Sequence, residues 1–418
     1  MPYSGNKALP ATVACVAAFC IFVISKTCPA RQVHGAGTAG RNTVAVYDWP
    51  CYHPSKFMQA KLGKGWTEWD LLKKAKARFP GQYQPKVPLW GYTNEANPQV
   101  MAHAIAAMAD NGVNVIIFDW YRFQHNKSIL ESALRDGFLK APNHDRVKFA
   151  LMWANQSFGN VFPFKPGETW SNIPVWIHAA VDRRDFDRIT RSAIHYFKNP
   201  DYWKVKGKPY FSTYDLPTLM RGLGGPAATH AALEHFRAEA RAAGFPGLDI
   251  NVIIKPYDLS HELALVKGQP MPGDPSQRIE TMADMLHAFG FNSGTLYTWA
   301  HQVAPNSPTE SYYRWGTDAV AGWPADTGYG IPFYPNVTVG WDGTPRHYPG
   351  GIVVDGSPRL FKDFLMRAKA WDDGHPSAGG IVTINAWNEW AEGSHLEPDV
   401  LHAMGYLDAV RSVFPPHK

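Results

Sequence analysis

Cysteine is scarce in this 418-residue chain, and most of it lies near the N-terminus. Three of the four cysteines, Cys15, Cys20 and Cys28, fall in or beside one short apolar stretch, which leaves Cys51 alone in the rest of the chain. A disulfide bond within the main body is therefore excluded. The fold must be stabilised by its hydrophobic core, which a chain of this length can form.

Charged residues are also few, at 18% of the chain against 45% hydrophobic residues. This balance excludes an intrinsically disordered chain. The formal net charge of +5 is spread thinly, and the densest basic run, Lys73 to Arg78 (KKAKAR), has helical spacing. Such spacing favours a solvated helix face over a nucleic-acid patch. We therefore expect no nucleic-acid partner.

The apolar stretch near the N-terminus, from about Ala11 to Ile24, is too short to span a bilayer comfortably. It follows Lys7 and precedes small and polar residues, which is the layout of a secretory signal. We therefore expect residues 1–35 to be a signal peptide and leader. The mature protein would then be secreted or periplasmic, with no membrane contact. An uncleaved signal anchor is the alternative.

Several motifs of other enzyme classes are missing. No G-x-G-x-x-G follows the first expected strand, and there is no Gly-rich phosphate loop, no G-x-S-x-G elbow and no H-E-x-x-H or paired Cys/His spacing. We therefore expect no cofactor and no metal. The D-F-D of Asp185 and Asp187 resembles the D-x-D of nucleotide-sugar transferases. It lies at an expected helix start, where acidic residues simply suit the helix dipole.

Aromatic residues, by contrast, are abundant. The chain has 16 Trp, 18 Tyr and 22 Phe, which is more than packing needs. Because aromatic faces stack on sugar rings and bases, this excess indicates a ligand with flat rings.

Short β-branched or aromatic runs alternate with segments of helical period. The expected strands are 43–50, 112–121, 147–155, 209–215, 248–257, 294–300, 331–341 and 379–390. The expected helices are 98–110, 127–139, 184–198, 228–243, 276–289, 310–321 and 358–373. Eight alternating units predict an α/β fold in which residues 40–415 form one (β/α)8 barrel domain with elaborated loops. An open, doubly wound sheet is the alternative.

Polar or aromatic residues end most of the expected strands. Because parallel strands end on one face of a barrel, where barrel enzymes keep their chemistry, we expect these residues to bind substrate. Packing at the barrel top and helix capping are the alternative roles. The strand-end residues are Tyr47, Asp48, Asp119, Trp120, Tyr121, Trp153, Asn155, Tyr214, Lys255, Trp299, Trp341, Asp342, Trp387 and Asn388. Trp66, Glu68 and Glu397, in neighbouring segments, complete the predicted binding set.

The most informative stretch is NAWNEWAEGSHLEPD, residues 385–399, at the end of the last expected strand. Glu389 and Glu392 are three residues apart, so a helical turn brings both carboxylates to one side. Glycoside cleavage needs such a pair, with pKa values that differ. Trp387 and Trp390 are candidates for the apolar walls that raise one of them. A solvated pair at a helix start is the alternative.

This stretch also resembles a known signature, the N-x-W-N-E-W-x-E-G-x-x-x-E-P of WbsX-like proteins. It is similar as well to their relatives in glycoside hydrolase family 99, the endo-α-mannosidases and endomannanases. Further matching segments are 63–92, 151–157, 199–215 and 337–346, so the similarity covers most of the chain after about residue 43. The resemblance implies an endo-acting hydrolase whose partner is a polysaccharide or oligosaccharide.

Carried over residue by residue, the resemblance makes Glu389 the base that deprotonates the sugar's own 2-hydroxyl, giving a 1,2-anhydro intermediate. Glu392 becomes the general acid and base. Two carboxyls on one short turn approach the sugar from one direction, which suits a nucleophile supplied by the substrate and overall retention. Since Glu392 must carry a proton at the working pH, we expect its pKa to lie near neutrality.

The chain departs from the family pattern in places. Ala391 stands where family 99 enzymes commonly have His, and Ser394 stands where they have Thr. The opening strand has Asp48 and Trp49 in place of a tyrosine and a proline, so the sugar at the cleavage point would sit in a different pocket. The alternatives are a WbsX-type glycosyltransferase and a non-catalytic carbohydrate-binding barrel. The sugar cleaved and the oligomeric state are left open.

Overall fold

The computed structural model describes residues 42–416, except for the side chains of residues 324–327. The predicted signal peptide and leader, residues 1–35, lie outside the described residues. Within the described part of the chain, every helix is too short or too polar to cross a bilayer.

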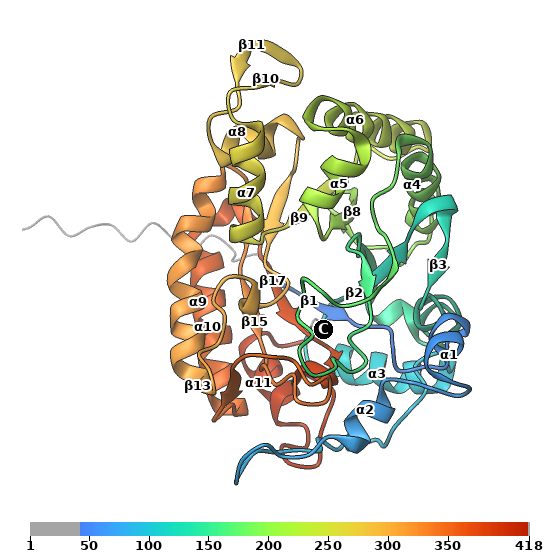
Figure 1. The fold of residues 1–418 in the computed structure, drawn as a ribbon, viewed down its shortest axis with the longest axis vertical. Helices are drawn as coiled ribbons and strands as arrows, with labels where there is room; N and C mark the ends of the chain where they lie inside the picture. The colour runs from blue at the N-terminus through green and yellow to red at the C-terminus, as the bar shows by residue number, and fades with distance from the viewer. Residues whose placement is uncertain (1–41, 417–418) are drawn as a thin grey trace, which may run out of the picture. The chain divides into compact units, whose positions relative to one another are not determined.

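Parallel strands form a barrel at the centre of the described residues (Figure 1). In the order of hydrogen-bonded neighbours they are β14 (Phe333–Tyr334), β12 (Ser293–Thr295), β9 (Asp249–Ile253), β8 (Lys208–Thr213), β4 (Lys148–Trp153), β2 (Val115–Arg122), β1 (Thr43–Asp48), β17 (Ile381–Asn385) and β15 (Asn336–Thr338). Because β14 and β15 are consecutive in the chain, the two ends of this order meet and the barrel is nearly closed. The predicted single-domain (β/α)8 barrel is confirmed.

Helices follow the strands and surround the barrel (Figure 1). They are α3 (Pro98–Asp110), α4 (Arg183–Phe197), α5 (Leu216–Leu223), α6 (Pro226–Ala242), α7 (Pro256–Val266), α8 (Met282–Ala288), α9 (Tyr312–Asp326), α10 (Pro358–Gly374) and α11 (Gly405–Val413). Two shorter helices, α1 (Lys56–Leu62) and α2 (Trp69–Lys74), lie in the excursion after β1. The side chains of Asn97, Asp182 and Ser357 accept backbone N–H groups at the starts of α3, α4 and α10, which fixes where these helices begin.

The prediction of a helix over 127–139 is wrong. This segment forms a short strand, β3 (Ser128–Ile129), antiparallel to β2, followed by a π-helical turn over Ala133–Gly137. The cause is Glu131, whose carboxylate accepts hydrogen bonds from three side chains and also pairs with Arg122. A regular helix would carry Glu131 away from these partners.

Two further elements differ from the prediction. The segment expected to be a helix over 276–289 begins as a hairpin strand, β11 (Asp274–Arg278), paired with β10 (Pro270–Met271). Helix α8 starts only after Thr281, whose hydroxyl accepts the backbone N–H of Asp284. The strand expected over 331–341 breaks into β14 and β15 at Pro335, because proline has no N–H to give to the ladder.

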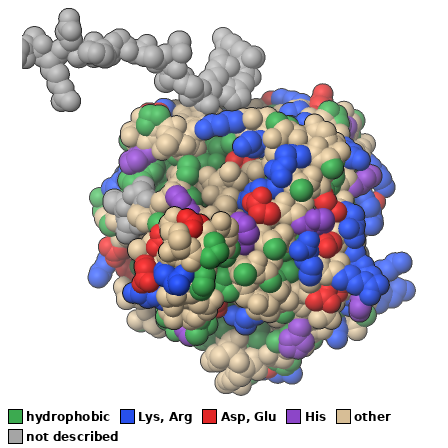
Figure 2. Space-filling model, turned by 90° about the horizontal axis from the view of Figure 1, so that it is seen from above, with side chains coloured by type: hydrophobic (Ala, Val, Ile, Leu, Met, Phe, Trp, Pro, Cys, Tyr) green, Lys and Arg blue, Asp and Glu red, His purple; other side chains and the backbone are tan. Residues whose placement is uncertain are grey.

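The two charged motifs lie in different surroundings. Helix α2 ends at Lys74, so the basic run continues as exposed coil to Arg78 rather than as a helix face. Asp185 and Asp187 lie near the start of α4, as predicted, and pair with arginines of the same helix. On the face in Figure 2, acidic and basic side chains are interspersed.

The interior of the barrel is unusually polar. Alternate residues of each strand point inward, and several of these are Ser, Thr or Asn. Ser212 Oγ donates to Asn251 Oδ1 over 2.9 Å, and Asn251 Nδ2 donates to Ser293 Oγ over 2.9 Å. The hydroxyls of Thr295 and Thr383 are 2.9 Å apart. All five residues are buried, so these hydrogen bonds satisfy polar groups that water cannot reach.

Candidate active site

The chain turns sharply after β17 and presents two glutamates at the carboxyl end of the barrel. Strand β18 (Asn388–Glu389) pairs with β19 (Ser394–His395), and a 3₁₀ turn over Trp390–Glu392 joins them. Gly393 ends this turn with φ 71°, and a Cβ there would lie 2.9 Å from the backbone nitrogen of Asp342. Only glycine suits both the conformation and the contact. The hairpin therefore fixes both carboxylates on one short segment.

A buried arginine, Arg346, joins three glutamates. Its Nη1 donates to Glu392 Oε1 over 2.6 Å, its Nη2 lies 3.5 Å from Glu389 Oε2, and its Nε donates to Glu68 Oε1. The hydroxyl of Tyr348 lies 2.9 Å from the same Nη1 and donates to Glu392 Oε1 over 3.0 Å. The Arg346 side chain is 3% exposed, so it depends on these carboxylates for its stability.

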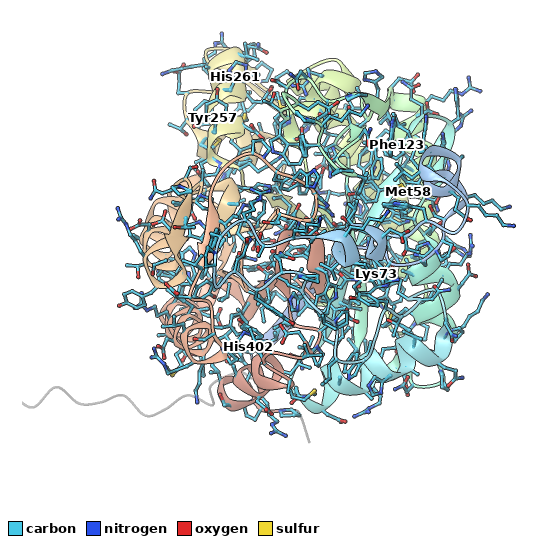
Figure 3. All side chains as sticks on the ribbon, turned by 60° about the horizontal axis from the view of Figure 1, so that its bottom comes forward. Met58, Lys73, Phe123, Tyr257, His261 and His402 are labelled. Carbon is cyan, nitrogen blue, oxygen red and sulfur yellow. The ribbon has the colours of Figure 1, made fainter. Side chains whose placement is uncertain are left out.

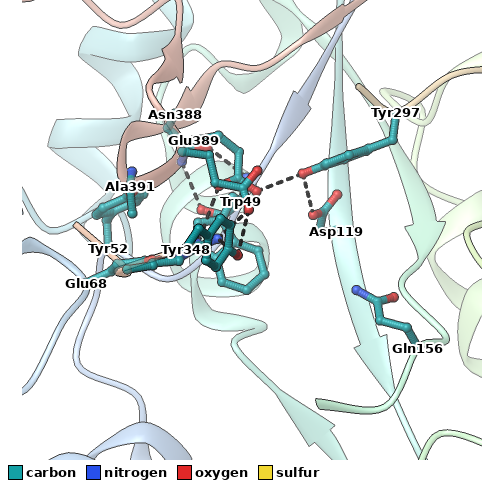
Figure 4. Close-up of polar contacts among 12 residues, drawn as sticks. Trp49, Tyr52, Glu68, Asp119, Gln156, Tyr297, Tyr348, Asn388, Glu389 and Ala391 are labelled. Carbon is teal, nitrogen blue, oxygen red and sulfur yellow. Dashed lines mark hydrogen bonds and ion pairs between the residues drawn. The ribbon is translucent and has the colours of Figure 1, made fainter. Parts of the chain in front are cut away.

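Tyr297 links the deeper glutamate to a third carboxyl group. Its hydroxyl lies 3.0 Å from both Asp119 Oδ2 and Glu389 Oε1 (Figure 4). A phenol carries one hydrogen, so it donates to one of these groups at a time. The other contact becomes a hydrogen bond only when that carboxyl group is itself protonated. Both carboxyls are almost fully buried, and burial raises the pKa of each, which favours the protonated form that this geometry can accommodate.

Asn388 attaches the hairpin to the end of β1. Its Oδ1 accepts the backbone N–H of Trp49 over 2.8 Å, and its Nδ2 donates to Asp48 Oδ1 over 3.0 Å. The same Nδ2 lies 3.2 Å from Glu95 Oε2. With its amide fully engaged by the protein, Asn388 positions the adjacent Glu389 rather than presenting a group to a ligand.

Burial raises the pKa of both hairpin glutamates. For Glu389 the nearby charge of Glu392 raises the pKa further, and Arg346 opposes this. For Glu392 the hydrogen bonds and charge of Arg346 and the Tyr348 hydroxyl oppose the effect of burial. Burial also raises the pKa of Asp119 well above its usual range. These groups therefore hold protons more readily than isolated carboxyl groups do, which is a property of groups that act as acid and base.

The two glutamates differ in access. The side chain of Glu392 is 11% exposed and that of Glu389 is 4% exposed. Tyr297 and Asp119 surround Glu389 inside the barrel mouth, whereas Glu392 lies nearer the surface with Tyr348. Among the described residues, no group of three or more His, Cys, Asp or Glu side chains is arranged to hold a metal ion.

The family model described as glycosyltransferase WbsX matches residues 43–410. The chain belongs to the WbsX family. The resemblance inferred from its motifs is thus confirmed. Two curated relatives, both uncharacterized proteins named WxcX from Xanthomonas campestris pv. campestris (strains B100 and ATCC 33913), are each 28% identical over 382 residues. The match covers 88% of this chain and 49% of the relatives, so the chain spans about half their length.

Solved structures share the fold at low sequence identity. A glycoside hydrolase-like protein has a TM-score of 0.55 and 13% identity, covering 94% of this chain and 97% of that chain. A glycoside hydrolase family 99 endo-α-mannosidase from Bacteroides thetaiotaomicron, in complex with Bis-Tris propane, has a TM-score of 0.54 and 13% identity, covering 89% and 96%. The likeness shows a common barrel architecture between the WbsX-family chain and these proteins.

Part of the predicted binding set surrounds the carboxylates of this WbsX-family chain. Glu68 precedes α2 but does not cap it, since its carboxylate binds Trp49 Nε1 and Arg346. Tyr47 packs on Tyr297 with ring centroids 4.8 Å apart. Those that directly contact the cluster of Glu389, Glu392, Arg346, Tyr297 and Tyr348 are Tyr47, Glu68, Asp119, Tyr214 and Trp341. Tyr121 contacts it through Trp49, and Asn388, next to Glu389 in the chain, donates to Asp48.

Four predicted residues lie at the edge of this region, engaged by the protein itself. Trp66 packs edge-on against Phe162, with ring centroids 5.6 Å apart. Asp342 accepts hydrogen bonds from two glutamine side chains and a backbone N–H. Glu397 accepts Trp390 Nε1 over 2.7 Å, and Trp387 packs on Trp90.

The remaining predicted residues point away from the carboxylates. Trp120 and Trp153 face the helix layer, where Trp120 Nε1 donates to Glu131 and Trp153 packs on Phe186 of α4. Trp299 is buried against α9 and α10. Asn155 uses its amide on the backbone after β8, and Lys255 pairs with Asp215 at 2.6 Å. We expected all five to line the site. Trp120 and Trp153 lie in β2 and β4, where alternation sends every second side chain outward, whereas Asn155, Lys255 and Trp299 follow the ends of their strands.

Several residues of the site had escaped the sequence prediction. Tyr297 lies two positions before Trp299 in the same predicted strand, and two-residue periodicity alone does not favour either. Arg346 is the last residue of the matched segment 337–346, so the family resemblance gave some indication of it. Glu95 and Tyr348 lie in loops, and nothing local in the sequence marks them.

Proposed function

We propose that this WbsX-family chain is a retaining glycoside hydrolase that cleaves a polysaccharide or oligosaccharide with participation of the sugar 2-hydroxyl. One observation carries the proposal: two buried glutamates with raised pKa values share a single hairpin at the barrel mouth, one beside Tyr297 and the other nearer the surface.

Glu389 takes the proton of the 2-hydroxyl, and the freed oxygen attacks the anomeric carbon. The bond to the leaving oxygen breaks while Glu392 gives that oxygen its proton. Water then opens the 1,2-anhydro ring from the opposite face, with Glu392 accepting the water proton and Glu389 returning its own proton to the 2-oxygen. Two inversions at one carbon give overall retention.

The electrostatics suit this division of roles. Glu392 is buried enough to hold a proton, and its greater exposure lets it reach a leaving group and then a water molecule. When Glu392 is protonated, the negative charge that raises the pKa of Glu389 disappears. Arg346 and Tyr297 then favour ionised Glu389, so the pair carries one proton in the state that reacts.

The alternative is the activity that the family description names, a glycosyltransferase. A transferase that uses a nucleotide sugar must bind a diphosphate. The carboxyl groups around the hairpin are Asp48, Glu68, Glu95 and Asp119 as well as the two glutamates, and Arg346, the cation within this cluster, is already paired with three of these groups. Because these carboxyl groups already occupy Arg346, the cluster offers little positive charge to a diphosphate, so we favour hydrolysis.

The test uses Glu389→Gln and Glu392→Gln proteins with a panel of polysaccharides, beginning with yeast mannan. Each substitution should lower the rate by about 10²- to 10⁴-fold while sugar binding persists. Glu262→Gln, at a buried glutamate of α7 paired with Arg221, is the matched control and should retain activity. Full activity in either hairpin variant would exclude these glutamates as catalytic residues.

A substrate that lacks the 2-hydroxyl separates this mechanism from other retaining routes. With hydrogen or fluorine at that position, the substrate should not turn over. Ready turnover with retention would rule out participation of the 2-hydroxyl, and an inverted product would exclude the mechanism. Transfer of sugar from a nucleotide-sugar donor, with no hydrolysis, would favour the transferase.

We also propose that the protein acts outside the cytoplasm, on the basis of the apolar stretch from about Ala11 to Ile24. Mass spectrometry of exported protein should find an N-terminus between about residues 25 and 40. An intact N-terminus on membrane-bound protein would favour the signal anchor instead.

A further inference from the structure

A groove of about 1000 Å³ crosses the barrel rim on the side of Glu392. It is lined by Gly393, which directly follows Glu392, and by Trp341. Trp341 packs on Tyr348 with ring centroids 6.1 Å apart, and Tyr348 donates its hydroxyl to Glu392. Trp341 in the wall of the groove therefore contacts Tyr348, the residue that donates a hydrogen bond to Glu392.

The groove is large. Its lining extends to Tyr312 at the start of α9, to Tyr406 of α11 and to His402, which is labelled in Figure 3. Sites for drug-sized ligands occupy about 300 to 1,000 Å³, so this volume is more than one sugar ring needs.

The lining combines aromatic rings with hydrogen-bonding groups. Phe79 and Tyr83 line the groove from the loop after α2, as do the tyrosines of α9 and α11. The formal charges nearly cancel, since the cations Arg78 and Lys86 face Asp342, Asp355 and Asp399. Near neutrality with many aromatic rings favours an uncharged sugar chain over a polyanion or a cationic ligand.

We propose that this groove binds several uncharged sugar units on the leaving side of the cleaved bond. The inference rests on the proposed function, in which Glu392 protonates the leaving oxygen. Sugars attached to that oxygen must lie on the Glu392 side of the hairpin, where Gly393, the next residue, lines the groove. The shape of the groove thus selects substrates that continue beyond the cleavage point.

Gly356 offers a way to fill the groove without disturbing the hairpin. It lines the groove, and a Cβ added there would meet only the Tyr406 hydroxyl at 3.8 Å and a ring carbon of Tyr312 at 4.0 Å. A large side chain at this position would occupy the volume between the two tyrosines. Gly374, the exposed last residue of α10 with nothing within 4 Å of an added Cβ, provides the matched control.

The experiment measures migration of the inactive Glu392→Gln protein through gels that contain yeast mannan, dextran, xylan or the anionic polymer alginate. At least one neutral polymer should retard the protein. Adding Gly356→Trp should weaken the apparent affinity at least about tenfold, whereas adding Gly374→Trp should leave it within about twofold. Gly356→Leu, a smaller filler, serves if the tryptophan variant fails to fold.

Equal retardation of the Gly356 and Gly374 variants would overturn the inference, as would retardation by alginate alone or by no polymer. Hydrolysis by the otherwise unmodified protein is measured separately on the same polymers. If the polymer binds through the groove but is not cleaved, the proposed hydrolase function is wrong and the assignment of the groove as a sugar-binding site stands. If it is cleaved equally well with the groove filled, the groove assignment fails and the hydrolase remains.

Discussion

Replacing Arg346 with methionine tests whether the glutamate cluster depends on this one cation. The guanidinium bonds to Glu392 and Glu68, lies 3.5 Å from Glu389, and is almost fully buried. Removing one partner from such a buried cluster costs about 3 to 5 kcal/mol, because the remaining charges lose their compensation.

The loss of stability caused by Arg346→Met should be larger at higher pH. Without Arg346 the folded protein must take up about one additional proton on its glutamates. Protonating a carboxyl of ordinary pKa costs about 3.7 kcal/mol at pH 7 and about 1 kcal/mol at pH 5. Because the folded variant then binds more protons than the unfolded chain, its free energy of unfolding falls as pH rises through this window. The loss of stability should therefore be about 2.7 kcal/mol larger at pH 7 than at pH 5.

Urea unfolding monitored by tryptophan fluorescence at the two pH values gives this difference. Arg237→Met is the matched control, because Arg237 is also buried but donates to the backbone oxygens of Phe289 and Gly290 and pairs with the partly exposed Glu234. Its loss should be similar at both pH values. An equal loss at pH 5 and pH 7 for Arg346→Met, or a loss below about 1 kcal/mol, would refute the reasoning.

Three further outcomes are expected. Tyr297→Phe should lower kcat at least about tenfold and shift the pH–rate profile, because Asp119 and Glu389 lose their shared hydroxyl; an unchanged profile contradicts this. Burial raises the pKa of Glu397 to about 8, so the free energy of unfolding should fall as the pH rises from about 4.5 to 8. Glu397→Gln should remove this decrease, which urea unfolding at several pH values measures. Trp170 is 60% exposed and its ring centroid lies 5.0 Å from that of Tyr348, so we expect it to bind substrate. Trp170→Ala should therefore raise KM about fivefold, whereas Tyr257→Ala should leave KM unchanged.

The barrel could be predicted from the sequence because the pattern that indicates each strand is local. Each strand shows its own apolar run, and parallel pairing then places all strand ends on one face. The errors have local causes as well. Pro335 divides a strand, and Glu131 prevents a helix by binding partners on β2 and α4 that no window around it contains.

The site was predictable only where its residues are neighbours in sequence. Glu389 and Glu392 stand three apart in one motif, whereas Arg346 reaches Glu68 across 278 residues. Tyr297 contacts Glu389 across 92 residues. Strand ends predicted which residues lie at the rim, but not which face inward. The outward direction of Trp153 is set by the register of β4 in the closed barrel, and Trp299 lies in a 3₁₀ turn beyond the end of β12.

The pairing of the first barrel strand with the last ties the assembly of the site to the end of folding. The backbone of Trp49 and the amide of Asn388 meet across 339 residues, and β1 pairs with β17 along its length. Closing so long a loop is entropically costly and slow, so we expect this contact to form late in folding. A growing or partly unfolded chain therefore keeps Glu389 and Glu392 away from Trp49 and Glu68, and the cluster around the two glutamates is complete only once the chain has closed the ring.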